Sequence, residues 1–224
     1  MSAKKSGQFL GVLTLFALGA STAGASILEF ENLSTYASLY TYGSNMTSAC
    51  TGSGQAGCVG EGNGFTPDIA VSYATLGYAA EMAQWPTGYG NLPGAAYSLM
   101  SGNTPDITLT PQNGATVTLN SFELAGYYET DYSNQPVEVL DADNNILWSY
   151  TGNISGSGPS STQFTVGITS SGPLQIEFGN NWNVGIEDIN FDENVSAPEP
   201  AAWLLLVSGL GLGVLLKRRA LPGV

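Results

Sequence analysis

Short runs of alternating apolar and polar residues recur along the middle of the chain, separated by clusters of Gly, Asn, Ser and Pro. Alternation with a period of two is typical of a strand with one buried face, and turn-forming clusters end such strands. The pattern predicts strands at residues 27–32, 69–73, 106–110, 116–127, 137–140, 146–150, 163–168, 174–178 and 184–191. No segment of this region has a convincing helical period. We therefore expect an all-β domain, a β-sandwich or jelly roll.

The clearest hairpin is predicted around the sequence Asp-Ala-Asp-Asn-Asn at 141–145, which lies between two apolar runs. Asp and Asn side chains favour turns and tolerate left-handed backbone. The same run also matches the first positions of an EF-hand calcium loop. That match ends at Ile146, where the loop requires Gly, and no Glu occupies the twelfth position. The pattern favours the plain turn, and the calcium loop stays open as an alternative.

The first 25 residues have the three zones of a secretory signal peptide. Lys4 and Lys5 precede an apolar run at 9–20, and Ala23 and Ala25 form an A-x-A cleavage site before Ser26. An apolar run of 12 residues is too short to span a bilayer, which needs about 20. We expect export, with a mature chain that starts at Ser26.

The last residues, 197–224, are predicted to form a membrane-targeting tail. The apolar segment 201–216 has no charge and precedes Lys217, Arg218 and Arg219. Such a segment predicts a single transmembrane helix, and the basic cluster is expected on the cytoplasmic side. An ordinary single-pass anchor and a packed terminal helix are the alternatives. The Pro198-Glu199-Pro200 sequence forces an extended entry into the helix.

Pro-Glu-Pro, a short Leu/Gly-rich helix and a terminal basic cluster together resemble the PEP-CTERM sorting signal of bacterial proteins. The resemblance covers residues 197–224, although this chain continues for five residues beyond Arg219. It implies processing by a membrane protease of the exosortase type. It also implies delivery to the envelope, the outer surface or the extracellular polysaccharide of a Gram-negative-type bacterium.

Charge excludes several functions for the middle region, 26–196. All five basic residues lie outside it, there is no histidine, and it holds every acidic residue except Glu199, that is 17 of 18. Nucleic-acid binding needs cations to neutralise phosphates, so it is excluded. Catalysis through histidine, a lysine Schiff base or an arginine clamp is excluded as well. Paired carboxylates, as in glycoside hydrolysis, are the catalytic equipment that remains.

The sequence segments 28–32, 119–126 and 184–192 resemble parts of the ectodomains of PEP-CTERM proteins. Those ectodomains look like galactose-binding-type jelly rolls. The resemblance implies that the first and last strands lie close together and that carboxylates on them hold a structural calcium. The implied ligands are Glu29, Glu31, Asp188 and Asp192. A strongly acidic region without cations favours a divalent counter-ion, and oxygen ligands suit calcium. The alternative is that these acids face water.

Two further sets of residues are candidates for a role. Cys50 and Cys58 bracket a Gly-rich segment, and in an oxidising compartment they are expected to pair as a disulfide. Trp85, Tyr89 and Trp182 lie in loop-like sequence beside Gly, Pro and Asn. Rings in such places can stack on sugars, and they can equally be core residues.

The sequence thus predicts an exported, surface-sorted, non-catalytic module with a structural or binding role in the extracellular matrix. Binding of carbohydrate and calcium is the most specific expectation. The alternative is a glycoside-cleaving enzyme that uses two carboxylates.

Overall fold

The computed structural model describes residues 25–31, 33, 37–46, 66–78 and 82–195. The regular elements in this part are all strands. Within these ranges no helix has the length and apolar character needed to cross a bilayer. The predicted signal peptide up to Gly24, the tail from Ser196 onward, and Cys50 with Cys58 lie outside the described residues. Those expectations stay predictions.

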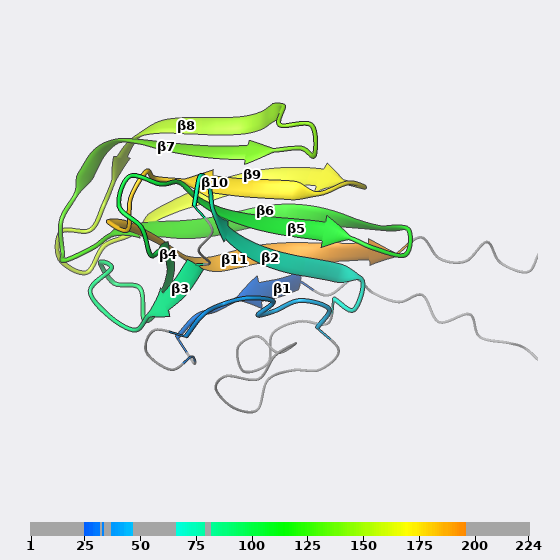
Figure 1. Ribbon diagram of the computed structural model, residues 1–224, viewed down its shortest axis with the longest axis horizontal. Helices are drawn as coiled ribbons and strands as arrows, with labels where there is room; N and C mark the ends of the chain where they lie inside the picture. Colours follow the sequence, from blue (N-terminus) through cyan, green and yellow to red (C-terminus); the bar gives the residue numbers. More distant parts are fainter. Residues whose placement is uncertain (1–24, 32, 34–36, 47–65, 79–81, 196–224) are drawn as a thin grey trace, which may run out of the picture. The chain divides into compact units, whose positions relative to one another are not determined.

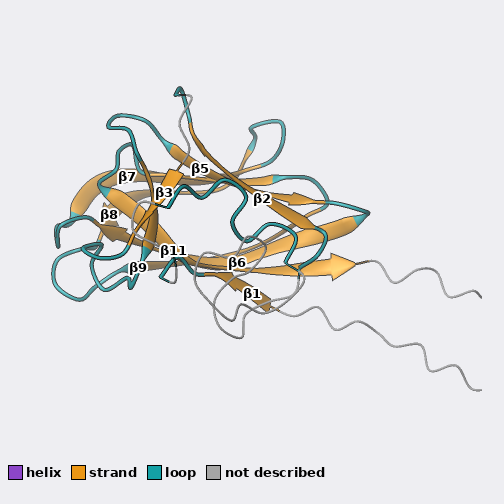
Figure 2. Ribbon diagram, turned by 60° about the horizontal axis from the view of Figure 1, so that its bottom comes forward, coloured by secondary structure: helices purple, strands orange, loops and turns teal. Residues whose placement is uncertain are grey.

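The strands form two antiparallel sheets that pack face to face, which Figure 2 shows nearly edge-on. In the first sheet the order is β3 (Met82–Trp85), β4 (Ala95–Ser98), β11 (Val184–Val195), β6 (Ala115–Gly126) and β9 (Thr162–Ser170). The order in the second sheet is β2 (Ile69–Thr75), β5 (Pro105–Pro111), β10 (Leu174–Phe178), β7 (Tyr132–Leu140) and β8 (Ile146–Ile154). The expected β-sandwich is therefore confirmed.

The connectivity of the last eight strands is that of a jelly roll. Strands β4, β11, β6 and β9 are neighbours in one sheet, and β5, β10, β7 and β8 are neighbours in the other. Counted from β4 as the first strand, these orders are 1-8-3-6 and 2-7-4-5, the arrangement produced by two interlocked Greek keys. Such an arrangement brings the last strand, β11, to the middle of its sheet, between β4 and β6 (Figure 1).

Strand β1 (Ala25–Leu28) pairs antiparallel with β11, and Ala25 lies opposite Asp192. The first and last described strands are thus neighbours, as expected. Ala25 and Ser26, the predicted cleavage position, lie at the start of β1. The expected strand 27–32 is displaced, because the ladder ends at Leu28 and Phe30 instead donates its N–H to the side chain of Glu187.

The core lies between the two sheets and is made by the alternating apolar positions of both. Its large, fully buried members include Phe30, Phe122, Phe178, Phe191 and Ile107. Burying a side chain of this size contributes about 2 kcal/mol relative to exposure. The period-two pattern of the sequence therefore translates directly into the sandwich.

The predicted hairpin at 141–145 is confirmed by the pairing of β7 with β8, in which Val139 lies opposite Trp148. One oxygen of Asp141 accepts the backbone N–H groups of Asp143 and Asn145, each at 2.9 Å. Asn144 has a φ of 60°, in the left-handed region. These hydrogen bonds lower the pKa of Asp141, with the contacts to Asn145 contributing most. The segment is thus built as an Asx-stabilised turn.

Candidate functional site

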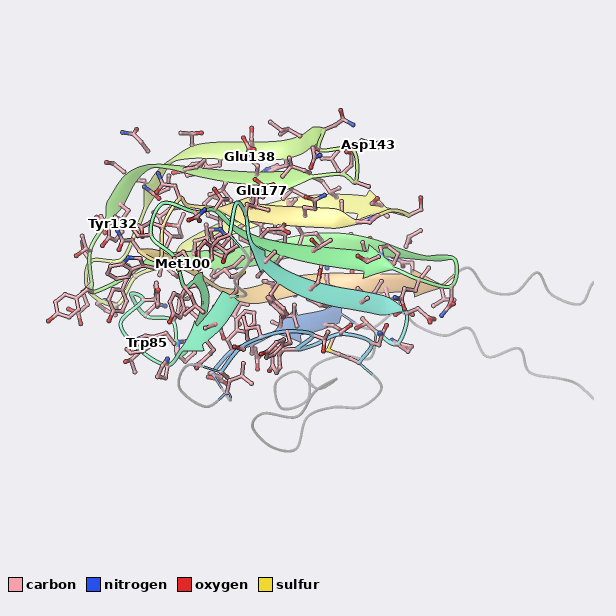
Figure 3. All side chains as sticks on the ribbon, in the orientation of Figure 1. Trp85, Met100, Tyr132, Glu138, Asp143 and Glu177 are labelled. Carbon is pink, nitrogen blue, oxygen red and sulfur yellow. The ribbon has the colours of Figure 1, made fainter. Side chains whose placement is uncertain are left out.

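An aromatic cleft forms where the β3–β4 connection meets the end of β6. Trp85 closes β3 and pairs with Ala95, the first residue of β4. Figure 3 labels Trp85 at this end of the sandwich. The nine residues between these two strands contain two Pro and three Gly, so the segment turns back sharply and carries Tyr89 inward.

Tyr89 is buried and ties the cleft to a second loop. Its hydroxyl donates a hydrogen bond to the carbonyl oxygen of Trp182 at 2.5 Å. Burial raises the pKa of the Tyr89 phenol, and the neighbouring Tyr97 and Tyr127 raise it further. The phenol therefore keeps its proton at all ordinary pH values and keeps donating. Because of this bond, the loop before β11 is held against the β3–β4 connection.

Tyr127, directly after β6, is in contact with most of the other rings. Its ring centroid lies 5.0 Å from that of Tyr89, 5.3 Å from that of Trp182 and 6.4 Å from that of Trp85. The planes of Tyr127 and Trp182 meet at 67°, and those of Tyr127 and Trp85 at 81°. Edge-to-face contacts of this kind favour a fixed arrangement of the rings. The backbone N–H of Tyr127 also donates to the carbonyl of Asn183 at 2.7 Å.

Glycine at position 185 in β11 is required for this packing. An added Cβ there would lie 2.8 Å from the ring of Tyr89 and 2.8 Å from the Cβ of Ala95. Real Cβ atoms do not approach so closely, so any side chain would displace Tyr89 or β4. The missing side chain at Gly185 thus leaves space in β11 for the ring of Tyr89.

Five aromatic residues line the resulting cleft, whose volume is about 190 Å³: Trp85, Tyr89, Tyr97, Tyr127 and Trp182. Tyr89 and Tyr97 are buried, Trp85 and Tyr127 are half-buried, and Trp182 is 39% exposed. A lining of this kind offers apolar ring faces with phenol and indole hydrogen-bond donors at their edges. It suits a flat ligand that has both apolar C–H faces and hydroxyl groups.

The structure brings together the three aromatic residues that the sequence singled out, Trp85, Tyr89 and Trp182. Sequence reasoning missed the role of Tyr127, because this residue reads as the last position of a strand. Trp148, by contrast, packs between the sheets against Phe122 and Phe164.

The four acids proposed as calcium ligands are placed near β1 and β11, but they do not form one group. Asp192 accepts a hydrogen bond from Asn120 at 2.9 Å. Glu29, Glu31 and Asp188 lie close enough to Glu187 to raise its pKa. Within the described ranges, no three His, Cys, Asp or Glu side chains are grouped so as to hold a metal ion. Calcium binding stays a prediction.

Glu187 is a buried acid that the sequence did not reveal. It is fully buried, and one carboxyl oxygen accepts the N–H of Phe30 at 2.8 Å, while the other has no hydrogen-bond partner in the described structure. Burial raises the pKa of Glu187 well above its ordinary value, and the charge of Asp188 adds to this effect. The Glu187 carboxyl therefore keeps its proton to a higher pH than an exposed glutamic acid does. Glu187 lies opposite Glu123 of β6, and a β-bulge follows it in β11, where Asp188 has a φ of 51°.

No known family matches the sequence, and no curated protein matches it either. Among solved structures, an arabinose-bound MgGH51 α-L-arabinofuranosidase is 12% identical with a TM-score of 0.37, and the match covers 76% of this chain and 32% of that one. A GH26-CBM35 β-(1,4)-mannanase from Podospora anserina is 18% identical with a TM-score of 0.31, over 59% of this chain and 29% of that one.

The adhesin domain of Lys-gingipain from Porphyromonas gingivalis is 17% identical with a TM-score of 0.32, over 56% of this chain and 90% of that one. The match to the arabinofuranosidase covers about a third of that protein, and the match to the mannanase covers slightly less of that one. The fold is that of a β-sandwich, and the site is an aromatic cleft at one end of it.

Proposed function

We propose that this protein is an exported, surface-sorted β-sandwich that binds carbohydrate without cleaving it. The observation that carries this proposal is the cleft of five aromatic rings held together by Tyr127. Sugar rings have one apolar C–H face and a rim of hydroxyl groups, so an aromatic ring can stack on the face while phenols and indoles bond the rim.

The way in which the rings are held also supports binding. Tyr89 is fixed by its hydrogen bond to Trp182, and Tyr127 by its backbone bond to Asn183. A cleft that is already formed costs little conformational entropy on binding. The partly exposed Trp182 and Trp85 leave a way in for a ligand.

Export and sorting belong to the same proposal. The signal-like residues up to Ala25 would direct the chain across the inner membrane. The Pro198-Glu199-Pro200 motif, the apolar segment 201–216 and the cluster Lys217–Arg219 would deliver it to an exosortase-type protease. The partners are then that protease, the membrane that holds the apolar segment, and the extracellular polysaccharide.

The lining of the cleft favours binding over cleavage. A glycoside hydrolase needs two carboxyl groups, about 5–10 Å apart, on either side of the scissile bond. The described residues that line the cleft are all aromatic. Cleavage of a glycan by this protein would therefore refute the proposal.

The test measures binding of the purified full chain to a panel of soluble polysaccharides by isothermal titration calorimetry. Trp182→Ala is expected to weaken binding about tenfold, which corresponds to about 1.4 kcal/mol. Tyr78→Ala is the matched control, because Tyr78 is exposed but does not line the cleft, and it should bind like the unaltered chain. Equal affinity of all three proteins, or the release of new reducing ends, would reject the proposal.

A further inference from the structure

A second hollow adjoins the aromatic cleft and carries a carboxylate. Its volume is about 290 Å³, and Gly88, Tyr128 and Glu129 line it. The ring of Tyr128 lies 6.0 Å, centroid to centroid, from that of Tyr127, which lines the cleft itself. Tyr128 is 80% exposed, and Glu129 is exposed as well. The contact between Tyr127, which lines the cleft, and Tyr128, which lines the second hollow, places the two hollows next to each other.

The backbone of this second hollow is held in an unusual conformation. Tyr128 and Glu129 have φ values of 57° and 52°, so two consecutive residues other than Gly adopt the left-handed region. Such conformations cost free energy and persist where surrounding contacts enforce them, often at ligand sites. Here the N–H of Tyr128 donates to the carbonyl of Gly88 at 2.7 Å, and Thr130 donates to the carbonyl of Tyr128 at 3.0 Å.

Gly88 allows this close approach of the two loops. Its φ is 89°, and an added Cβ would lie 3.3 Å from the ring of Tyr127. The loops are thus fixed so that an exposed ring and an exposed carboxylate stand next to the aromatic cleft. Packing of the core does not explain this arrangement, because the side chains of Tyr128 and Glu129 both face solvent.

The charge of the chain narrows the class of ligand. Between Ser26 and Ser196 there are 17 acidic residues and no Lys, Arg or His. An acidic glycan would find no counter-charge at this surface, and the net charge would repel it. A ligand with positive groups would be attracted by the net charge, by the faces of the aromatic rings, and by the carboxylate of Glu129.

We propose that the cleft and the adjoining hollow bind a glycan with free amino groups, whose sugar faces stack on Tyr127 and Trp182 while an ammonium group pairs with Glu129. This inference rests on the proposed carbohydrate binding and specifies its ligand class. Protonated amino sugars combine the two features that the surface selects, an apolar ring face and a positive charge.

The test compares three oligosaccharides of equal length on the full chain by isothermal titration calorimetry at low and at physiological salt. Oligomers of β-1,4-linked glucosamine should bind about tenfold more tightly than N-acetylglucosamine oligomers, and alginate oligomers should bind weakest. The glucosamine preference should shrink when salt is added, because the ammonium–carboxylate attraction is screened.

Two matched variants locate the effect. Glu129→Gln is expected to lower the affinity for the glucosamine oligomer about fivefold and to leave the affinity for the N-acetylglucosamine oligomer unchanged. Glu138→Gln makes the same charge change on β7, in the other sheet, where Figure 3 labels Glu138, and it should change neither affinity.

The outcomes separate this inference from the function on which it rests. Equal affinity for the amino and the N-acetylated sugars, with both lost in Trp182→Ala, would overturn the inference and leave carbohydrate binding intact. Equal losses in Glu129→Gln and Glu138→Gln would also overturn it, since general charge attraction would then explain the preference. Spermidine binding as tightly as the glucosamine oligomer would show that no sugar is recognised. If none of the oligomers binds to the chain, both proposals are overturned.

Discussion

Asp106 in β5 is a buried carboxyl group whose ionisation opposes folding. Its side chain is 7% exposed. One oxygen accepts a hydrogen bond from Thr108 at 3.1 Å, and the other is buried with no hydrogen-bond partner in the described structure. Across the sheet, Asp106 lies opposite Glu177 in β10, which itself lies opposite Glu138 in β7. Figure 3 labels both glutamates. Like charges directly opposite one another in a sheet destabilise it.

The size of the effect follows from the pKa. The pKa of Asp106 is raised from 3.8 to about 6: burial is the main cause, the Thr108 hydrogen bond acts in the opposite direction, and the charge of Glu177 contributes to the rise. Below pH 3.8 the carboxyl is protonated in both the folded and the unfolded chain, and stability is unaffected. Between pH 3.8 and 6 only the unfolded chain releases the proton, so the free energy of unfolding falls by about 1.4 kcal/mol per pH unit. By pH 7 the loss is about 3 kcal/mol.

Asp106→Asn removes this loss, because an amide does not ionise. The difference in unfolding free energy, variant minus unaltered chain, should rise by about 2.5 kcal/mol from pH 4 to pH 7. Urea unfolding of the full chain, followed by tryptophan fluorescence at each pH, measures this difference. The control is Asp141→Asn: because hydrogen bonds lower the pKa of Asp141, its difference should stay nearly constant from pH 4 to pH 7 and should change, in the opposite direction, mainly below pH 4. A difference for Asp106→Asn that does not vary with pH would refute the reasoning.

Three further predictions concern the cleft, calcium and sorting. Gly185→Ala should lower the unfolding free energy by about 1–3 kcal/mol and weaken glycan binding, because its Cβ would displace the ring of Tyr89, while Gly172→Ala should be neutral in both assays. Calcium should raise the melting temperature more than sodium chloride of equal ionic strength, and equal shifts would argue against a specific ion site. Replacing Glu199 or deleting Lys217–Arg219 should misdirect the protein in cell fractionation, and normal surface delivery of both variants would contradict the sorting proposal.

The alternating pattern predicted the long strands well, because each buries one face and exposes the other. Strand β10 was predicted with its observed ends, and most other strands extend the predicted runs by a few residues. The two missed strands are β3 and β4. Each has only four residues, and β4 is buried at every position, so neither shows alternation between its Gly- and Pro-rich flanks.

This omission matters for the site, because β3 and β4 carry two of its five rings. Trp85 and Tyr89 were recognised from their loop-like surroundings, but no local pattern indicated their contact with Tyr127. That contact depends on pairing between segments some 40 residues apart. The burial of Glu187 could not be predicted from the sequence for a related reason. A bulge between Glu187 and Asn190 interrupts the alternation of β11 beside this acid, and no local pattern signals such an interruption.

The antiparallel pairing of β1 with β11 also determines how the domain would be presented on a cell. Ala25 and Val195 both lie at the end of β11 that is farthest from Trp182 and Val184. With 12 residues at about 3.3 Å each, β11 separates the two poles of the domain by about 40 Å. A tether joined at Val195 would therefore start at one pole of the domain, and the aromatic rings lie at the opposite pole, where a long polymer could reach them without passing the tether.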